Sequence, residues 1–302
     1  MKSTTIYPKI INHYEQWLAN QFHLTEVTIA NYGRWSRYFL NYLSAFNLPR
    51  LNDVDNDIVH QFIHFRKDKR TGVIKPYAQA SIKSRLTALD LFFTWAYSEG
   101  HCRENPILRY KKSQLKNKPL IKREKVEAPI VVLTAKEQKK LKQLKTEGDY
   151  TQIRDKCIVL TILASALFAE ELITLPIKDF HLNKGYLTLS RDHKPKRKVP
   201  LDLLLCEDAC YAWLKIRKDL LGKAKQPLLF FNQSLQPLSK RMLYKIASEI
   251  LAGAHIEKTH CGPDMLRQSA ICNLLEKNTL EEVEKITGIK NLEHYRQATK
   301  NI

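Results

Sequence analysis

Glycine, proline and acidic residues are scarce in this chain of 302 residues. Its 9 glycines and 12 prolines are too few for long low-complexity tracts. Its longest apolar run, residues 158–167, is too short to cross a bilayer. The first residues lack the apolar segment of a secretory signal, so we expect a soluble cytoplasmic protein with no membrane attachment.

Cysteine is present, but not in a metal-binding pattern. The six cysteines mostly fall within apolar helical patterns, where a free buried thiol is the usual state. Cys206 and Cys210 are one helical turn apart, yet no second pair of Cys or His nearby completes a zinc site. We therefore expect a reducing compartment, no structural metal and no cofactor.

Positive charge is abundant. Fifty Lys and Arg residues face 31 Asp and Glu residues, which gives a formal net charge of +19. Such an excess repels itself in the folded state and usually has a polyanionic partner. Double-stranded DNA is the partner that we expect, with a membrane surface or a merely solvated basic surface as the alternatives.

The apolar periodicity indicates two helix-rich domains. The first, residues 1–108, holds four or five amphipathic helices. In its clearest helix, residues 82–96, the apolar stripe faces the core, and Lys83 and Arg85 point away as candidates for DNA contact. Asn56 is expected to cap an earlier helix.

A basic segment follows the first domain, and we assign residues 109–128 to a linker. Between Arg109 and Lys125 the chain carries eight Lys or Arg residues, among them Lys111 and Lys112, and one acid, Glu124. The functional interpretation is a strap along a phosphate backbone, and the alternative is a solvated linker.

The second domain, residues 129–302, is mostly helical with one small sheet. Thr134 and Glu137 have capping-box spacing, and a long apolar helix is expected over residues 153–167. Two β-rich runs flank a basic turn and predict a hairpin over residues 186–201. Four basic residues there are candidates for phosphate contact: Lys194, Lys196, Arg197 and Lys198.

The order of these motifs resembles the tyrosine recombinases of the phage-integrase and Xer type, over nearly the whole chain. Residues 171–180 read ELITLPIKDF and are similar to the family segment E-L-x-x-L-x-x-x-D-[IF]. The hairpin ends in V-P-L, as the family's does. Residues 263–269 read PDMLRQS and resemble the box P-H-x-L-R-H-[ST]. Residues 286–289 read ITGI, where L-L-G-H is expected, and Tyr295 follows at the nucleophile's place.

This resemblance implies a fold and a chemistry. The fold would be mainly α, with an N-terminal SAM-like core-binding domain and a C-terminal catalytic-type domain of the DNA breaking-rejoining kind. The family's tyrosine attacks a DNA phosphodiester without metal, so two arginines must meet the phosphoryl charge. Histidines and a hairpin lysine move protons, because a free tyrosine has a pKa of about 10.

The chain departs from the family pattern at most catalytic positions. The first arginine is replaced by Phe168, the two box histidines by Asp264 and Gln268, and the histidine of L-G-H by Ile289. Asp192 stands where the lysine is first expected, with Lys194 and Lys196 close behind. Arg267 and Tyr295 keep the expected residue types, and Arg154 or Arg191 could replace the missing cation in space.

Three interpretations follow. The leading one is a duplex-DNA-binding protein of recombinase type that takes part in site-specific recombination or integration, with weak or no cleavage of its own. Its expected partners on DNA are a second copy of itself or another recombinase. The second is an active recombinase that forms a phosphotyrosine link through Tyr295 in a rearranged site. The third is a structural or replication-linked DNA binder without a recombination role. RNA binding is disfavoured, since no RNP-type aromatic signature occurs.

Overall fold

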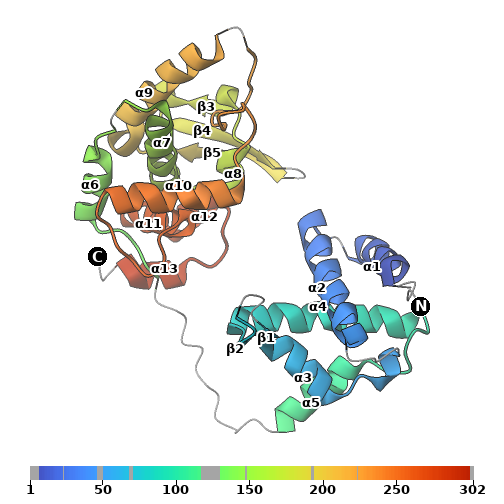
Figure 1. Ribbon diagram of the computed structural model, residues 1–302. Helices are drawn as coiled ribbons and strands as arrows, with labels where there is room; N and C mark the ends of the chain where they lie inside the picture. Colours follow the sequence, from blue (N-terminus) through green and yellow to red (C-terminus); the bar gives the residue numbers. More distant parts are fainter. Residues whose placement is uncertain are drawn as a thin grey trace. The chain divides into compact units, whose positions relative to one another are not determined.

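The chain folds into two compact units, Met1–Glu124 and Lys125–Ile302 (Figure 1). The computed structural model describes residues 7–22, 24–45, 50–67, 71–116, 130–146, 148–191, 194–222 and 224–299. Within these ranges the chain is mainly helical, with one two-stranded and one three-stranded antiparallel sheet. The expected fold class is therefore confirmed. No helix in these ranges is long and apolar enough to cross a membrane.

The first unit is a helical bundle with one short hairpin. Its described elements, in chain order, are α1 (Tyr7–Gln21), α2 (Glu26–Ala45), η1 (Leu51–Asp53), α3 (Asn56–His64), β1 (Phe65–Lys67), β2 (Ile74–Pro76), α4 (Gln79–Ser98) and α5 (Pro106–Lys116). The hairpin of β1 and β2 was not predicted. Asp55, rather than Asn56, caps α3, since its carboxylate accepts a hydrogen bond from the Ile58 amide.

Aromatic side chains fill the core of this unit. Phe39 of α2 meets Phe62 of α3 edge to face, with 5.0 Å between ring centres. Tyr14 of α1 meets Phe92 of α4 in the same way at 5.4 Å. The stripe predicted on α4 faces this core, where Leu89 is fully buried. Edge-to-face pairs add to the free energy gained from burial, so these rings hold the helices together.

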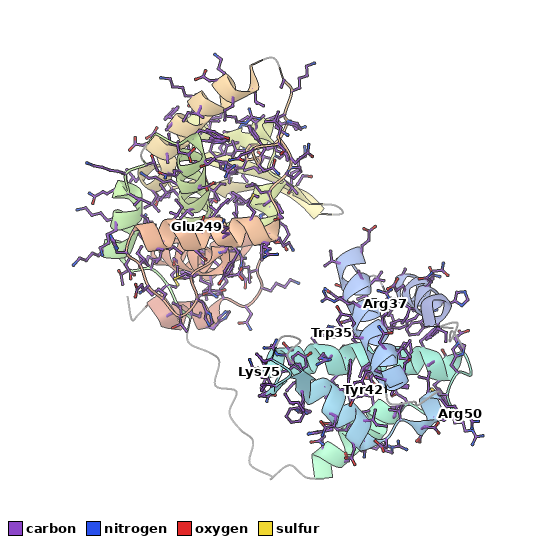
Figure 2. All side chains as sticks on the ribbon, in the orientation of Figure 1. Trp35, Arg37, Tyr42, Arg50, Lys75 and Glu249 are labelled. Carbon is purple, nitrogen blue, oxygen red and sulfur yellow. The ribbon has the colours of Figure 1, made fainter. Side chains whose placement is uncertain are left out.

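Arg85 corrects the sequence prediction, because its side chain turns into the core of the first unit. It is 3% exposed, and its guanidinium carbon lies 4.0 Å from the ring centre of Tyr77 and 4.2 Å from that of Phe62. Trp35 of α2, labelled in Figure 2, lies 4.6 Å away. A planar cation can be buried among aromatic faces, which helical periodicity does not reveal. Lys83 is exposed as expected.

The start of the predicted linker also needs correction. The sequence prediction assigns residues 109–116 to the linker, but they belong to helix α5. Asn105 caps this helix by accepting a hydrogen bond from the Ile107 amide at 2.9 Å. Ile107 and Tyr110 are buried in the core of the first unit. The ammonium of Lys111 pairs with Asp90 of α4 at 2.6 Å. The surrounding lysines concealed the short apolar face of α5, and residues 117–128 lie outside the described ranges.

The second unit surrounds a buried helix with other helices and a small sheet. Its described elements, in chain order, are α6 (Ala135–Gln143), α7 (Tyr150–Ser165), α8 (Ala169–Ile173), η2 (Ile177–Asp179), β3 (Phe180–His181), η3 (Leu182–Lys184), β4 (Tyr186–Arg191), β5 (Lys194–Pro200), α9 (Leu203–Leu221), α10 (Lys240–Gly253), α11 (Pro263–Lys277), α12 (Leu280–Thr287) and α13 (Glu293–Thr299).

Helix α7 is the centre of this unit and packs against α9, α10 and α11. Its residues from Cys157 to Ser165 are all buried, as expected for the long apolar helix. The predicted hairpin is present as β4 and β5, with Leu187 opposite Val199 and Leu189 opposite Arg197. The capping box of Thr134 and Glu137 is present as well.

All six cysteines are free thiols, as expected. Cys157 of α7 and Cys210 of α9 lie in the core with their sulfur atoms 3.7 Å apart. Across the described part of the chain, no three Cys, His, Asp or Glu side chains group in a way that could hold a metal ion.

Candidate functional site

Arg267 is the centre of the site. It lies on the buried face of α11, one turn after the helix begins at Pro263, and is 8% exposed. Its Nε donates a hydrogen bond to the carbonyl of Ala166 at 3.2 Å. Ala166 follows α7 and has the left-handed φ of 54°. Burial lowers the pKa of Arg267, but an arginine in a protein remains a cation. A fixed positive charge therefore lies at the end of α7.

Phe168 covers one face of this cation. Its ring centre is 3.4 Å from the guanidinium carbon of Arg267. Phe168 stands at the N-cap of α8, the position that the sequence comparison with the recombinases assigns to an arginine. The ring leaves the edges of the Arg267 guanidinium available for hydrogen bonds, while contributing neither charge nor a donor itself.

Glu171 and Arg197 form a second part of the site. Arg197 Nη2 lies 2.8 Å from Glu171 Oε1, and the Glu171 side chain is 4% exposed. The other carboxylate oxygen of Glu171 accepts a hydrogen bond from the Phe168 amide at 3.0 Å. Glu171 therefore joins the start of α8 to strand β5, next to Phe168.

Tyr295 lies in the same region. It is 8% exposed and packs in a small core with Ala166, Ile271 and Leu292. Burial raises the pKa of its phenol, and the charge of Arg267 lowers it in part. Tyr295 and Arg267 are therefore electrostatically coupled. A phenol with a raised pKa is a weaker source of the phenolate that a nucleophilic attack needs.

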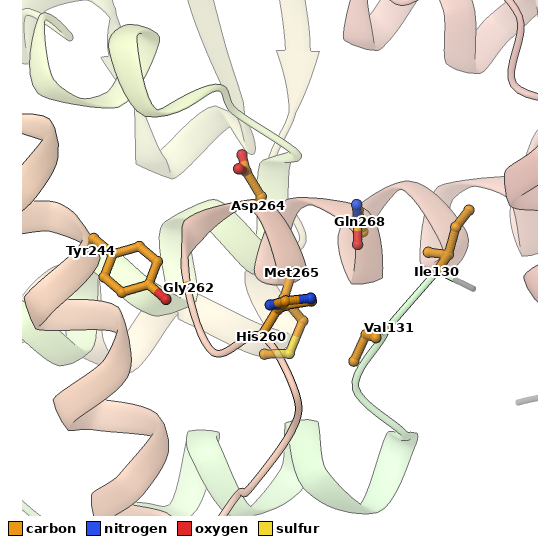
Figure 3. Close-up of a pocket in the computed structure, with 8 residues that line it drawn as sticks. All are labelled: Ile130, Val131, Tyr244, His260, Gly262, Asp264, Met265 and Gln268. Carbon is orange, nitrogen blue, oxygen red and sulfur yellow. The ribbon is translucent and has the colours of Figure 1, made fainter. Parts of the chain in front are cut away.

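Asp264 and Gln268, at the positions of the two box histidines, line a cavity of about 370 Å³ beside α11. Figure 3 shows Tyr244 on one side of this cavity and Ile130 and Val131 on the other. Asp264 is exposed, and its charge acts on both Arg267 and Tyr295. A carboxylate at this place repels an approaching phosphate, whereas a histidine would donate a hydrogen bond to it.

The turn after α12 brings a glycine against Arg197. Gly288 has a φ of 68°, and a Cβ atom added to it would lie 2.8 Å from Arg197 Nη1. Ile289, where the recombinases have histidine, packs against the small core that contains Tyr295. An apolar side chain at this position can neither donate nor accept a proton.

The described lysines of the hairpin are not part of this cluster. Lys196 and Lys198 are exposed on β5, and the Lys198 ammonium lies 5.0 Å from the ring centre of Tyr186. Lys112 is exposed on α5. The side chains of Arg191 and Lys194, and residue Asp192, lie outside the described residues.

Arg154 does not replace the missing cation. It bonds to Asp155 and to the carbonyl of Phe231. It lines a separate cavity with Glu249, which is labelled on α10 in Figure 2.

Arg197 differs from its basic neighbours in a way that the sequence prediction did not include. Side chains alternate across a strand, so Arg197 shares the face of Val199, which is buried, while Lys196 and Lys198 share the opposite face. This alternation was the available signal. The pairing with Glu171, 26 residues away, had no local signal.

Comparison with known proteins agrees with this fold. The sequence model of the phage integrase family matches residues 132–301, and that of the phage integrase N-terminal SAM-like domain matches residues 11–100. The chain belongs to the phage integrase family. Its tyrosine-recombinase character, inferred from the motifs, is thereby confirmed, and the family is one of site-specific recombination.

Curated relatives support the assignment to this family. The chain is 26% identical to tyrosine recombinase XerC of Vibrio vulnificus (strain YJ016) over 285 residues, which cover 94% of this chain and 84% of that protein. It is 25% identical over 272 residues to the XerC of Halalkalibacterium halodurans, covering 88% and 84% of the two chains.

Solved integrase-type structures share the fold. The recombinase XerH in a post-cleavage complex with palindromic difH substrate has a TM-score of 0.68, with 21% identity over 96% of this chain and 81% of that chain. A lambda integrase dimer bound to a COC′ core site has a TM-score of 0.63, with 17% identity over 96% and 94%.

Proposed function

We propose that this integrase-family chain binds duplex DNA at a specific site and takes part in recombination or integration, with weak or no strand cleavage of its own. The observation that carries the proposal is the stacking of Phe168 on Arg267. Arg267 keeps one phosphate-binding cation of the family pattern. The uncharged ring of Phe168 occupies the position of the other.

The binding half of the proposal rests on charge. The net charge of +19 and the exposed Lys83, Lys112, Lys196 and Lys198 suit a polyanion, and the XerH and lambda integrase structures are complexes with DNA. Each phosphate neutralised releases counterions, so the affinity should fall steeply as salt rises. Pairing on DNA with a second copy or with another recombinase belongs to the same proposal.

The cleavage half rests on the replaced side chains. Loss of one preorganised donor typically lowers a rate by about 10²–10³, and residues that act as a unit can fail with a single loss. Phe168, Asp264 and Ile289 supply no donor to a phosphoryl oxygen, and the raised pKa of Tyr295 works against phenolate formation.

A second candidate function is an active recombinase with a rearranged site. It is favoured by the electrostatic coupling of Tyr295 with Arg267 and by the position of Arg197 beside Glu171. In this case Tyr295 is the nucleophile, and the phenol oxygen forms the bond to phosphorus as the 5′ oxygen of the next nucleotide leaves.

One experiment separates the two. A bound site is first selected from random duplexes, and binding is measured at several salt concentrations. The site is then prepared with a 5′-bridging phosphorothiolate at each position in turn, which traps a covalent protein–DNA adduct. We expect salt-dependent binding and no adduct above the level of Tyr295→Phe. An adduct that Tyr295→Phe abolishes would establish the active enzyme, and absence of duplex binding would refute both candidates.

A further inference from the structure

Arg197 is placed differently from every other described basic residue of the hairpin. The neighbouring Lys196 and Lys198 reach solvent, whereas the side chain of Arg197 is 20% exposed and turns to the face of β5 that carries Val199. An inward-pointing arginine needs a partner, because taking a charge out of water is strongly unfavourable unless it is paired.

Glu171 is that partner, and it determines where Arg197 lies. The carboxylate binds Arg197 Nη2 through Oε1 and the amide of Phe168 through Oε2. The guanidinium is thereby held next to Phe168, whose ring lies on Arg267. A buried ion pair contributes little net stability by itself, so its main effect here is to position a cation.

Two donors of this cluster are unused. Arg197 Nε and Arg267 Nη2 are both buried, and neither has a hydrogen-bond partner among the residues that the structure describes. A buried donor without an acceptor is destabilising, and more so when it is charged. Arg267 is more than nine-tenths buried, so solvent does not replace the missing acceptor. The arrangement calls for an anion that accepts from both side chains.

Gly288 leaves room for the guanidinium of Arg197. Any Cβ at this turn would lie 2.8 Å from Arg197 Nη1, so a side chain there would displace the guanidinium. The turn also belongs to the segment that leads to α13, which carries Tyr295. Arg197 is therefore kept within the region of Arg267 and Tyr295.

We propose that Arg197 and Arg267 together bind one phosphodiester of the DNA, so that Arg197 provides the second cation of the site in place of the side chain at position 168. The inference rests on the proposed DNA binding. Guanidinium groups match phosphate oxygens with directed, charge-assisted hydrogen bonds, and the two unused donors are the atoms that would make them. Phe168 then closes one face of Arg267 and restricts the phosphate to its edge.

The test is a double-mutant cycle between Arg197 and single phosphates. In the selected duplex, each phosphate is replaced in turn by an uncharged methylphosphonate, and the affinity of the wild-type chain is measured. We expect one position at which the loss is about tenfold or more. Arg197→Gln should bind the unmodified duplex more weakly, and it should lose clearly less further affinity at that position than the wild-type chain, because only the contact of Arg267 remains. Lys198→Gln changes the exposed neighbour of Arg197. This variant should lose as much affinity at the sensitive methylphosphonate position as the wild-type chain does.

A second variant separates phosphate binding from folding. Arg197→Gln leaves the Glu171 carboxylate without its charged partner, so the double variant Glu171→Gln/Arg197→Gln removes that cost and should show the same reduced sensitivity to the neutralised phosphate. Thermal unfolding confirms that each variant is folded. A folded Arg197 variant that loses as much affinity as the wild-type chain at every methylphosphonate position would overturn the assignment of Arg197. That result would leave the proposed DNA binding intact. If the wild-type chain binds no duplex, the proposed function falls and this inference falls with it.

Discussion

The ring of Phe168 and the guanidinium of Arg267 are stacked, with 3.4 Å between the guanidinium carbon and the ring centre. A cation over an aromatic face gains about 2 kcal/mol or more when it is desolvated. This contact stabilises Arg267 in its buried position, but it also prevents a second charged side chain from approaching from the same side.

Replacing the ring with a cation should increase activity at the site. Phe168→Arg adds a donor next to Arg267, so we expect covalent adduct on the phosphorothiolate duplex to rise about tenfold or more above the Tyr295→Phe background. Phe168→Leu removes the ring without adding charge and should give no increase. The quantity of adduct resolved by denaturing electrophoresis measures the effect. Equal adduct from both folded variants would contradict the view that the missing cation limits cleavage.

The charge of Asp264 should weaken DNA binding. Asp264→Asn removes an exposed carboxylate that acts on Arg267, and we expect the affinity for duplex to rise about two- to fivefold at low salt. The gain should shrink at high salt, because exposed charges are screened. Glu276→Gln, an exposed acid near the other end of α11, is the control. If it raises the affinity as much, only the net charge matters.

Arg85 should contribute to stability rather than to DNA contact. Arg85→Lys loses the planar contacts with Trp35, Phe62 and Tyr77, and we expect the first unit to be destabilised by about 2 kcal/mol. Three of the 4 tryptophans lie in this unit, so urea unfolding followed by tryptophan fluorescence reports it. Lys83→Ala should leave the stability unchanged and weaken DNA binding. If Arg85→Lys weakened DNA binding without loss of stability, Arg85 would be a DNA-contacting residue after all.

The first unit should lose stability in mild acid through His64. The rings of His60 and His64 stack with 4.2 Å between centres, and both bond to the hydroxyl of Tyr110. Burial, and secondly the charge of His60, lower the pKa of His64. The unfolded chain therefore binds more protons than the folded chain below the ordinary histidine pKa of about 6.5. Neutral His64 therefore contributes fully to the unfolding free energy of the first unit above a pH of about 6.5. The contribution is lost as the pH falls through the lowered pKa of His64.

His64→Gln tests this expectation in urea unfolding at pH 8 and pH 5.5. The difference in unfolding free energy between the two pH values should be smaller in His64→Gln than in the wild-type chain. His13→Gln, which changes an exposed histidine of α1, should keep the wild-type difference. An unchanged difference in His64→Gln would show that the stacked pair does not respond to pH.

Much of the fold was readable from local patterns. The capping box at Thr134, the long buried helix α7 and the hairpin of β4 and β5 follow from side-chain spacing, because capping and periodicity act over a few residues. The same spacing misled at α5, where closely spaced lysines concealed Ile107 and Tyr110. Whether a short amphipathic face is buried depends on the surface that meets it, which a local window does not contain.

The sequence by itself determined the net charge, the order of the motifs and the identity of the replaced residues, since each of these is a property of the chain alone. Only the tertiary structure decided that Arg85 is enclosed by aromatic rings, that Phe168 stacks on Arg267, and that Arg197 is held by Glu171. These contacts join segments far apart in the chain, and burial in a shared core selects the partners. The missing cation could be read at position 168; the arginine that lies beside its place could be found only in three dimensions.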